Sequence, residues 1–156
     1  MRIFCLMIAR FALSAWIGAA VLFVVTGVQE VRHDFDSTIR DALAALRFPM
    51  YYYFGFTLTG IALLSTTVAA LLTPKCRRRL GISAGLVLVA MSMMVVDYIW
   101  IFQPLHEIVT AASSVKPAGF QTLHERSKHI NMIDLTICLV AAITLCWPIR
   151  SDTLTD

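Results

Sequence analysis

Charged residues are scarce in this chain, and that scarcity decides its class. Of the 156 residues, only 15% are lysine, arginine, aspartate or glutamate, whereas a typical soluble domain has about 25%. The net charge of +3 is small and is distributed among the connections between the apolar runs, which leaves no extended basic surface for a nucleic acid. A soluble domain is therefore not expected, and neither is a nucleic-acid partner.

Several signatures of enzymes are also missing from the sequence. It has no glycine-rich phosphate loop and no dinucleotide fingerprint. Ser127 follows His124 by three residues, but no adjoining glycine turn could supply an oxyanion hole. An enzyme is therefore not favoured. No repeat, low-complexity tract or linker divides the chain, so residues 1–156 are expected to form a single domain.

Apolar residues make up 58% of the chain and give it a mean hydropathy of +0.75. They are gathered in runs close to the 20 or so residues that cross a bilayer. The sequence thus predicts an all-α integral membrane protein, a four-transmembrane-helix bundle with spans at about 11–28, 49–72, 80–102 and 129–147. Arg10 interrupts the apolar start of the chain, which favours a retained first span over a cleaved signal peptide.

The connection at residues 30–47 is too polar to lie in lipid. Ile39, Leu43 and Leu46 would share one face of a helix that begins near Ser37, so a short amphipathic interfacial helix is expected between the first two spans. Phe48 and Pro49 would end it. The three tyrosines at 51–53 are then expected to form an aromatic belt at headgroup level.

The distribution of basic residues predicts the orientation. The short turn at residues 75–79 holds four cations, whereas the two long connections mix their cations with acids. By the positive-inside rule, both termini are therefore predicted to be cytoplasmic. Cys5, Cys76 and Cys146 would lie at inner ends, and Cys138 within the last span, so no disulfide framework is expected. The lipid bilayer is the expected partner, and small-residue faces fit either packing within the chain or a homo-oligomer.

The most informative stretch is FQTLHERSKHIN at residues 120–131, which leads into the last span. On a helix, His124, Ser127, Asn131 and Asp134 fall with Phe120 within a sector of about 80°. Small residues continue this polar stripe, so it is expected to face the inside of the bundle.

A second acid, Asp97, lies within the third predicted span. Carboxylates at such depth are costly and usually face a bundle interior or a watery cavity, where they serve a function. If the third and fourth spans are neighbours, Asp97 could reach Arg126 or His124. The alternative is that Asp97 and Asp134 only hold the helices together through hydrogen bonds.

Histidines and acids gather on the predicted outer side and suggest a divalent metal site. The candidate metal ligands are His124, His106 and His33. Their spacing is not diagnostic, because His124 and His129 are five residues apart and point to opposite sides of a helix. Solvated or hydrogen-bonded histidines at helix ends are the alternative, and haem with His124 and either His106 or His33 as axial ligands is another.

Three short motifs resemble a known family: Trp16-Ile17-Gly18 with Phe23, Phe48-Pro49-x-Tyr51-Tyr52, and Phe120-x-x-x-His124-x-x-Ser127-x-x-x-Asn131. In order and helix count, the chain resembles the transmembrane-protein-205-like family of four-helix membrane proteins. The resemblance implies a four-span membrane protein with His124, Ser127 and Asn131 as its signature. It implies no particular reaction, and the polar connection that contains His33 is not part of the family pattern.

The sequence as a whole favours a non-enzymatic multi-pass membrane protein. An outward-facing polar cavity, formed by His124, Ser127, Asn131, Asp134 and Asp97, would handle a small solute or a metal ion. A haem-binding redox membrane protein and a purely structural membrane subunit are the alternatives.

Overall fold

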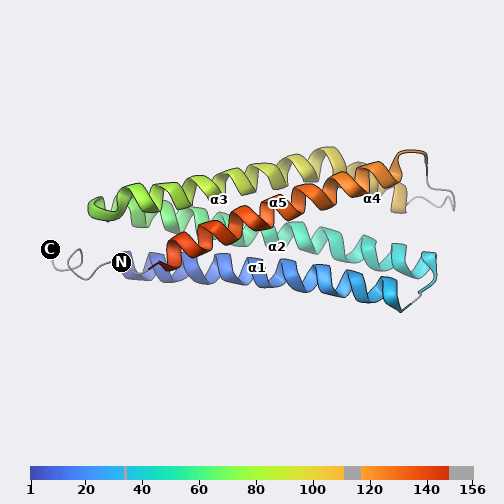
Figure 1. Ribbon diagram of the computed structural model, residues 1–156, viewed down its shortest axis with the longest axis horizontal. Helices are drawn as coiled ribbons and strands as arrows, with labels where there is room; N and C mark the ends of the chain where they lie inside the picture. Colours follow the sequence, from blue (N-terminus) through green and yellow to red (C-terminus); the bar gives the residue numbers. More distant parts are fainter. Residues whose placement is uncertain (34, 111–116, 148–156) are drawn as a thin grey trace.

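Four long helical stretches make up the computed structural model, which describes residues 1–33, 35–110 and 117–147 (Figure 1). Over these residues the chain is helical with no strand. The elements in order are α1 (Arg2–Arg32), α2 (Ser37–Leu71), the 3-10 helix η1 (Pro74–Cys76), α3 (Arg77–Asp97), the π-helix η2 (Tyr98–Phe102), α4 (Gln103–Thr110) and α5 (Phe120–Cys146).

Each of the four stretches is long and apolar enough to cross a membrane, when Pro74–Thr110 is counted as one stretch. Large apolar side chains cover their outer surfaces; Phe11, for example, is 76% exposed and Trp100 is 72% exposed. A helix satisfies its own backbone hydrogen bonds, which is the condition for lying in hydrocarbon. The predicted all-helical bundle with four candidate spans is therefore confirmed.

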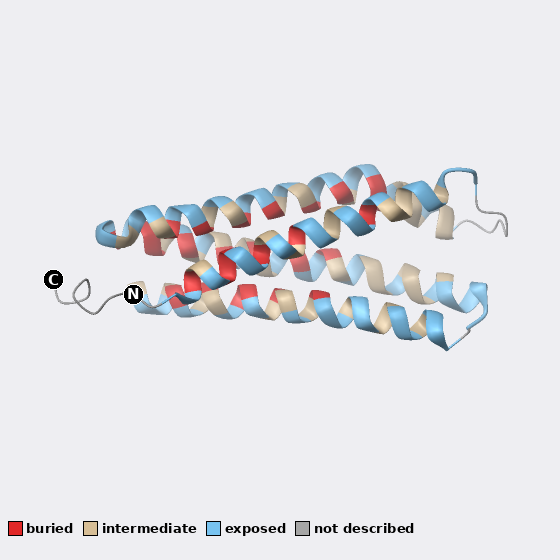
Figure 2. Ribbon diagram, viewed as in Figure 1, coloured by how far each residue is buried: buried red, intermediate tan, exposed pale blue. Residues whose placement is uncertain are grey.

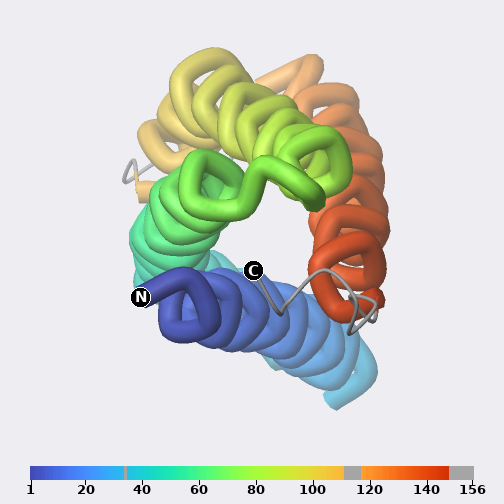
Figure 3. The backbone as a smooth tube through the Cα atoms, turned by 90° about the vertical axis from the view of Figure 1, so that its left-hand side faces the viewer, coloured from blue at the N-terminus to red at the C-terminus, as the bar shows by residue number. Residues whose placement is uncertain are grey.

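The helices form a closed ring when the bundle is viewed along its axis, in the order α1, α2, α3 and α5 (Figure 3). Connections between consecutive helices are short, so neighbours run in opposite directions. The N-terminus and the end of α5 consequently lie at the same end of the bundle, together with the turn around η1 (Figure 1). We call this the closed end and the opposite end, where α4 lies, the open end.

The helices are longer than the sequence predicted, and the separate interfacial helix is not found. Residues from Ser37 onward form the first turns of α2, which continues through Pro49. Contacts with α1 explain the continuity, because Arg47 forms an ion pair with Glu30 at 2.7 Å and donates a hydrogen bond to Thr26 Oγ1 at 3.0 Å. These bonds hold the start of α2 along the end of α1.

The predicted connection at 103–127 is also largely helical. η2 joins α3 to α4 without a break, and α5 begins directly after Gly119, whose φ of 105° suits a glycine. Asp34, Lys116 and Arg150, which contribute to the predicted distribution of charges, lie outside the described residues.

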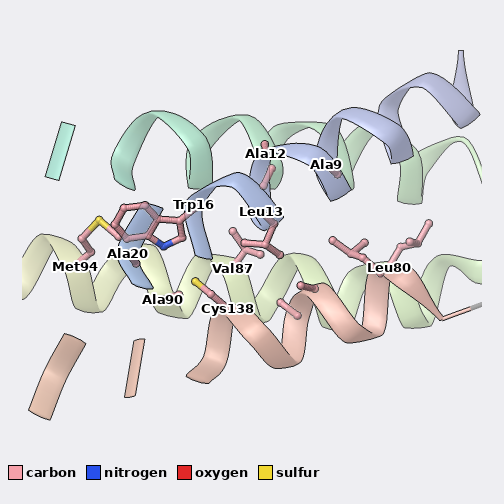
Figure 4. Close-up of a cluster of buried hydrophobic side chains, with 14 of the residues drawn as sticks. Ala9, Ala12, Leu13, Trp16, Ala20, Leu80, Val87, Ala90, Met94 and Cys138 are labelled. Atoms are coloured by element: carbon pink, nitrogen blue, oxygen red, sulfur yellow. The ribbon is translucent and has the colours of Figure 1, made fainter. Parts of the chain in front are cut away.

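The buried core occupies the closed end and the middle of the bundle (Figure 2). In α1 the last buried residue is Ala20, in α2 the first is Tyr52, in α5 the first is Ser127, and α4 has none. In the core, Leu13 of α1 lies beside Val87 of α3, with Trp16 on one side of this pair and Leu80 on the other (Figure 4). Ile101 and Phe102 of η2 are the last buried residues toward the open end within the described part of the chain.

Two arginines cap the C-terminal end of α5. Arg10 of α1 donates from Nε to the carbonyl oxygen of Leu145 at 2.9 Å, and Arg79 of α3 donates to that of Trp147 at 2.6 Å. The last carbonyls of a helix have no partner within it and carry partial negative charge, so cations are favourable there. Arg10, which the sequence marked as the edge of the first span, is therefore part of the packing between α1 and α5.

Gly55 allows Trp16 and Met94 to pack closely against α2. A Cβ atom at this position would lie 2.7 Å from Met94 Sδ and 2.8 Å from Trp16 Cη2. We expect Gly55→Ala to lower the free energy of unfolding by about 1–2 kcal/mol, because the buried indole cannot yield easily. Gly60→Ala in the same helix is the matched control, since a Cβ there meets nothing within 4 Å. Thermal unfolding in detergent measures both, and equal melting temperatures would contradict the prediction.

Candidate functional site

A buried carboxylate joins three helices near the boundary between the core and the open end. Asp97, the last residue of α3, is 0% exposed. Its Oδ2 accepts hydrogen bonds from Tyr52 Oη of α2 at 2.5 Å, from Asn131 Nδ2 of α5 at 3.0 Å and from Ser127 Oγ at 3.2 Å. One oxygen atom thus receives donors from two other helices.

Asn131 extends this network. Its Oδ1 accepts a hydrogen bond from Tyr51 Oη at 2.9 Å. Its Nδ2 lies within bonding distance of Asp97 Oδ2, of the Ser127 carbonyl oxygen at 2.9 Å and of Ser127 Oγ at 3.1 Å. Because an amide nitrogen carries two hydrogens, these three acceptors share them. Partners on α2, on α3 and on its own helix thus fix the orientation of the amide.

Three buried polar atoms in this part of the bundle have no hydrogen-bond partner: Asp97 Oδ1, Asp134 Oδ1 and Trp16 Nε1. Asp134 lies one turn after Asn131 on the same face of α5 and is 2% exposed. Within the described residues, no basic side chain forms an ion pair with Asp97 or Asp134. Two carboxyl groups buried without a countercharge are costly in a membrane-spanning bundle, so they mark a candidate site.

Aromatic rings pack around Tyr51 and Tyr52, the two tyrosines whose hydroxyl groups belong to this network. The Tyr52 ring lies 4.7 Å from that of Phe102 and 5.1 Å from that of Tyr98. The Tyr51 ring lies 4.6 Å from Phe23 and 5.0 Å from Trp16. These rings give the network an apolar surrounding, in which hydrogen bonds are stronger than in water.

The π-helix η2 begins directly after Asp97. π-turns are rare and occur frequently at functional sites, where they change the direction of side chains. Here the turn carries Tyr98 and Phe102, both of which contact the Tyr52 ring. No pattern in the sequence indicated this turn.

The tyrosines were also misplaced by sequence reasoning. Tyr52 is 2% exposed and Tyr51 is partly buried, so only Tyr53, at 69% exposed, fits the predicted aromatic belt. The signal was present in the spacing, since Tyr52 begins the inward stripe of α2: Tyr52, Gly55, Thr59, Ala62, Thr66 and Ala69. Reading that stripe from its start would have placed Tyr52 in the core.

The predicted stripe on the last helix is confirmed as an inward face. Ser127 and Asp134 are buried, as are Cys138, Ala141 and Leu145. Asn131 and Asp97 join Ser127 in one network. The expected pairing of Asp97 with Arg126 or His124 is wrong, because Tyr52 is its donor from the facing helix. His124 lies one turn before Ser127, and its ring is parallel to that of Phe120 at 6.3 Å.

The predicted metal ligands are not brought together. Over the described residues, no group of three or more histidine, cysteine, aspartate or glutamate side chains is placed to hold a metal ion. His33 lies at the end of α1, on the opposite side of the open end from α4, which contains His106 (Figure 1). The ring of His106 instead packs on that of Phe102, with 5.3 Å between the ring centroids. Helix arrangement, which the sequence did not reveal, separates these side chains.

The haem hypothesis, with His124 and His106 or His33 as ligands, stays a prediction, and an absorption spectrum of protein purified with haem present tests it. Comparison of the chain with family models, with curated proteins and with solved structures finds no match.

The bond from Tyr52 to Asp97 gives a direct test of the network. We expect Tyr52→Phe to lower the free energy of unfolding by about 1–2 kcal/mol, because a buried carboxylate oxygen loses one donor while the ring packing is kept. Tyr53→Phe is the matched control, since Tyr53 is exposed on the same helix. Thermal unfolding in detergent compares the two, and a Tyr52→Phe protein as stable as the control would refute this role of the hydroxyl.

Proposed function

We propose that the chain is a multi-pass integral membrane protein that binds and releases a small hard cation, in the simplest case a proton, at Asp97 and Asp134. The observation that supports this most strongly is the pair of buried carboxyl groups, each with one oxygen that has no partner. Acids inside membrane proteins characteristically serve proton relays and ion pathways. A bound cation removes the charge that the apolar bundle otherwise tolerates poorly.

The chemistry of the side chains favours a proton or a small cation with oxygen ligands. The groups around the site are carboxyl, hydroxyl and amide oxygens, which suit hard cations better than soft metals. Ser127, Asn131 and Tyr52 fix one oxygen of Asp97 and leave the other available. They thereby orient the group that takes up the cation.

The position of the site indicates the route of the cation. On the closed side it adjoins a packed apolar layer that contains Leu13, Val87 and Leu145, all fully buried. Beyond Ile101 and Phe102, toward the open end, none of the described residues is buried. The cation therefore enters from the open end, which the charge of residues 75–79 assigns to the outer side of the membrane, with both termini in the cytoplasm.

A structural role is the second candidate function, and one observation favours it. The hydrogen bonds to Asp97 Oδ2 connect α2, α3 and α5 at a single atom, as a clamp between helices would. The two functions differ in what they require of Asp97. A clamp needs an acceptor oxygen, whereas cation binding needs an ionisable carboxyl group.

The resemblance to the transmembrane-protein-205-like family is likewise a proposal, and so is assembly into a homo-oligomer. The motif residues Tyr52, Ser127 and Asn131 all donate to Asp97, so the resemblance would assign the family signature to the same cluster.

Asp97→Asn separates the two functions. Its amide oxygen still accepts the three hydrogen bonds, so we expect a folded protein with little change in melting temperature but with loss of cation binding. For Asp134→Asn we expect the same result: a folded protein that has lost cation binding. Asp36→Asn is the matched control, because Asp36 is an exposed acid outside the network. Infrared difference spectra between acid and alkaline pH would detect the carboxyl band of a protonated acid, and proteoliposomes with a pH-sensitive dye would measure proton movement.

Three results are decisive. A carboxyl band that disappears in Asp97→Asn or Asp134→Asn but not in Asp36→Asn supports proton binding. A response that requires sodium at constant pH assigns the site to that ion. Spectra and dye signals identical to those of the control, with no sodium response, would reject the cation function and leave the clamp.

A further inference from the structure

A long groove runs along the outer surface of the bundle between the α3–η2 rod and α5, on the opposite side of these helices from the Asp97 cluster. It consists of two hollows that share Ile130. One has a volume of about 540 Å³ and includes Trp100, Arg126 and His129 in its lining. The other has a volume of about 410 Å³ and includes Leu88 and Ser92.

The two ends of the groove differ in chemistry. The hollow that contains Leu88 is lined almost entirely by apolar side chains, and Ser92 Oγ is engaged with the Leu88 carbonyl oxygen at 2.9 Å. The other hollow carries the basic side chains. The groove therefore offers an apolar channel with a polar, basic end.

Arg126 supplies the charge at that end. It is exposed, and no hydrogen bond or ion pair links it to another residue in the described part of the chain. The neighbouring acid, Glu125, is paired with Lys128 at 3.0 Å. The guanidinium group is thus left available for an anion from outside the protein, and guanidinium groups bind phosphate in a bidentate manner.

His129 and Trp100 complete the basic end. His129 Nδ1 lies 2.7 Å from the Glu125 carbonyl oxygen, which can only accept, so Nδ1 carries the hydrogen and Nε2 is left with a lone pair that can accept a hydrogen bond. Trp100 is 72% exposed beside it. Exposed tryptophan is typical of the level of the lipid headgroups, where its ring is apolar and its N–H group polar.

The length of the groove matches half a bilayer. From Leu88 to Trp100 the helix rises by about 18 Å at 1.5 Å per residue. The hydrocarbon core of a bilayer is about 30 Å thick, so one leaflet contributes about 15 Å. An acyl chain that extends from the basic end would fill the groove to the middle of the membrane.

We propose that this groove is a binding site for an anionic phospholipid, whose phosphate group binds Arg126 and whose acyl chain lies over Ile130 toward Leu88. The proposal is independent of the cation function. A second copy of the chain fits the groove less well, because a two-fold pair of parallel subunits would place both Arg126 side chains at the same depth and on the shared interface. Like charges would then be brought together in a medium that screens them poorly.

Native mass spectrometry of the full chain from nanodiscs tests the site with two probes, phosphatidylglycerol and phosphatidylcholine with identical acyl chains. We expect the wild-type protein to retain phosphatidylglycerol preferentially. Arg126→Ala should weaken that retention about fivefold, the amount expected for one basic residue near a headgroup. Arg40→Ala is the matched control, because Arg40 is an exposed arginine in the first turns of α2, near the open end.

A second variant tests the apolar part of the groove. Ser92 is exposed, so Ser92→Phe fills the hollow without disturbing the core, and it should reduce the retention of both lipids. Equal retention of the two lipids by the wild type, or equal losses in Arg126→Ala and Arg40→Ala, would overturn the proposal. A dimer that Ser92→Phe dissociates, with no change in lipid retention, would assign the groove to a second copy instead.

Discussion

The packing of the helices depends on the hydrogen bonds that a carboxylate needs when it is buried in an apolar bundle. Asp97 is fully buried, and its Oδ2 receives hydrogen bonds from Tyr52, Ser127 and Asn131. Leaving such an oxygen without donors would cost several kcal/mol in a medium that contains no water. The donors must therefore come from neighbouring helices, and this requirement fixes the rotation of α2 and α5 toward α3. These bonds connect three helices at one oxygen atom, while the other oxygen of the same group, Oδ1, has no partner.

Charged side chains have different partners at the two ends of the bundle. At the closed end, Arg10 and Arg79 donate to the last carbonyls of α5, so charge is used to satisfy the backbone. Toward the open end, Glu30 and Arg47 pair with each other, and the guanidinium group lies over the Phe23 ring at 5.1 Å. Between these ends, Asp134 has an oxygen with no partner. The middle of the bundle is thus the place where a bound cation would contribute most.

Much of the fold was predictable because its signals are local. Hydropathy located the four spans, and the 3.6-residue period placed Ser127, Asn131 and Asp134 on one inward face. The helix limits were less predictable, since α2 continues through Pro49 with the help of the Arg47 contacts on α1. The site was only half predictable: its acids were found from their depth, but Tyr52 as the donor to Asp97, and the separation of His33 from His106, depend on which helices are neighbours. The residues of one chain carry no direct signal for which helices are neighbours.

The π-turn after Asp97 changes which residues face the inside of the bundle in the helical stretch from Arg77 to Thr110. Up to Asp97, the inward residues recur every three or four positions, as Leu80, Ser83, Val87, Ala90, Met94 and Asp97. A turn with a longer repeat shifts the residues that follow by about 100° relative to that stripe. Ile101 and Phe102 are consequently buried side by side, and the stripe passes to Phe102 and then His106. A regular α-helix of the same sequence would turn the Phe102 ring away from Tyr52, the tyrosine that donates to Asp97. The contact between these two rings therefore depends on the one extra residue in the π-turn.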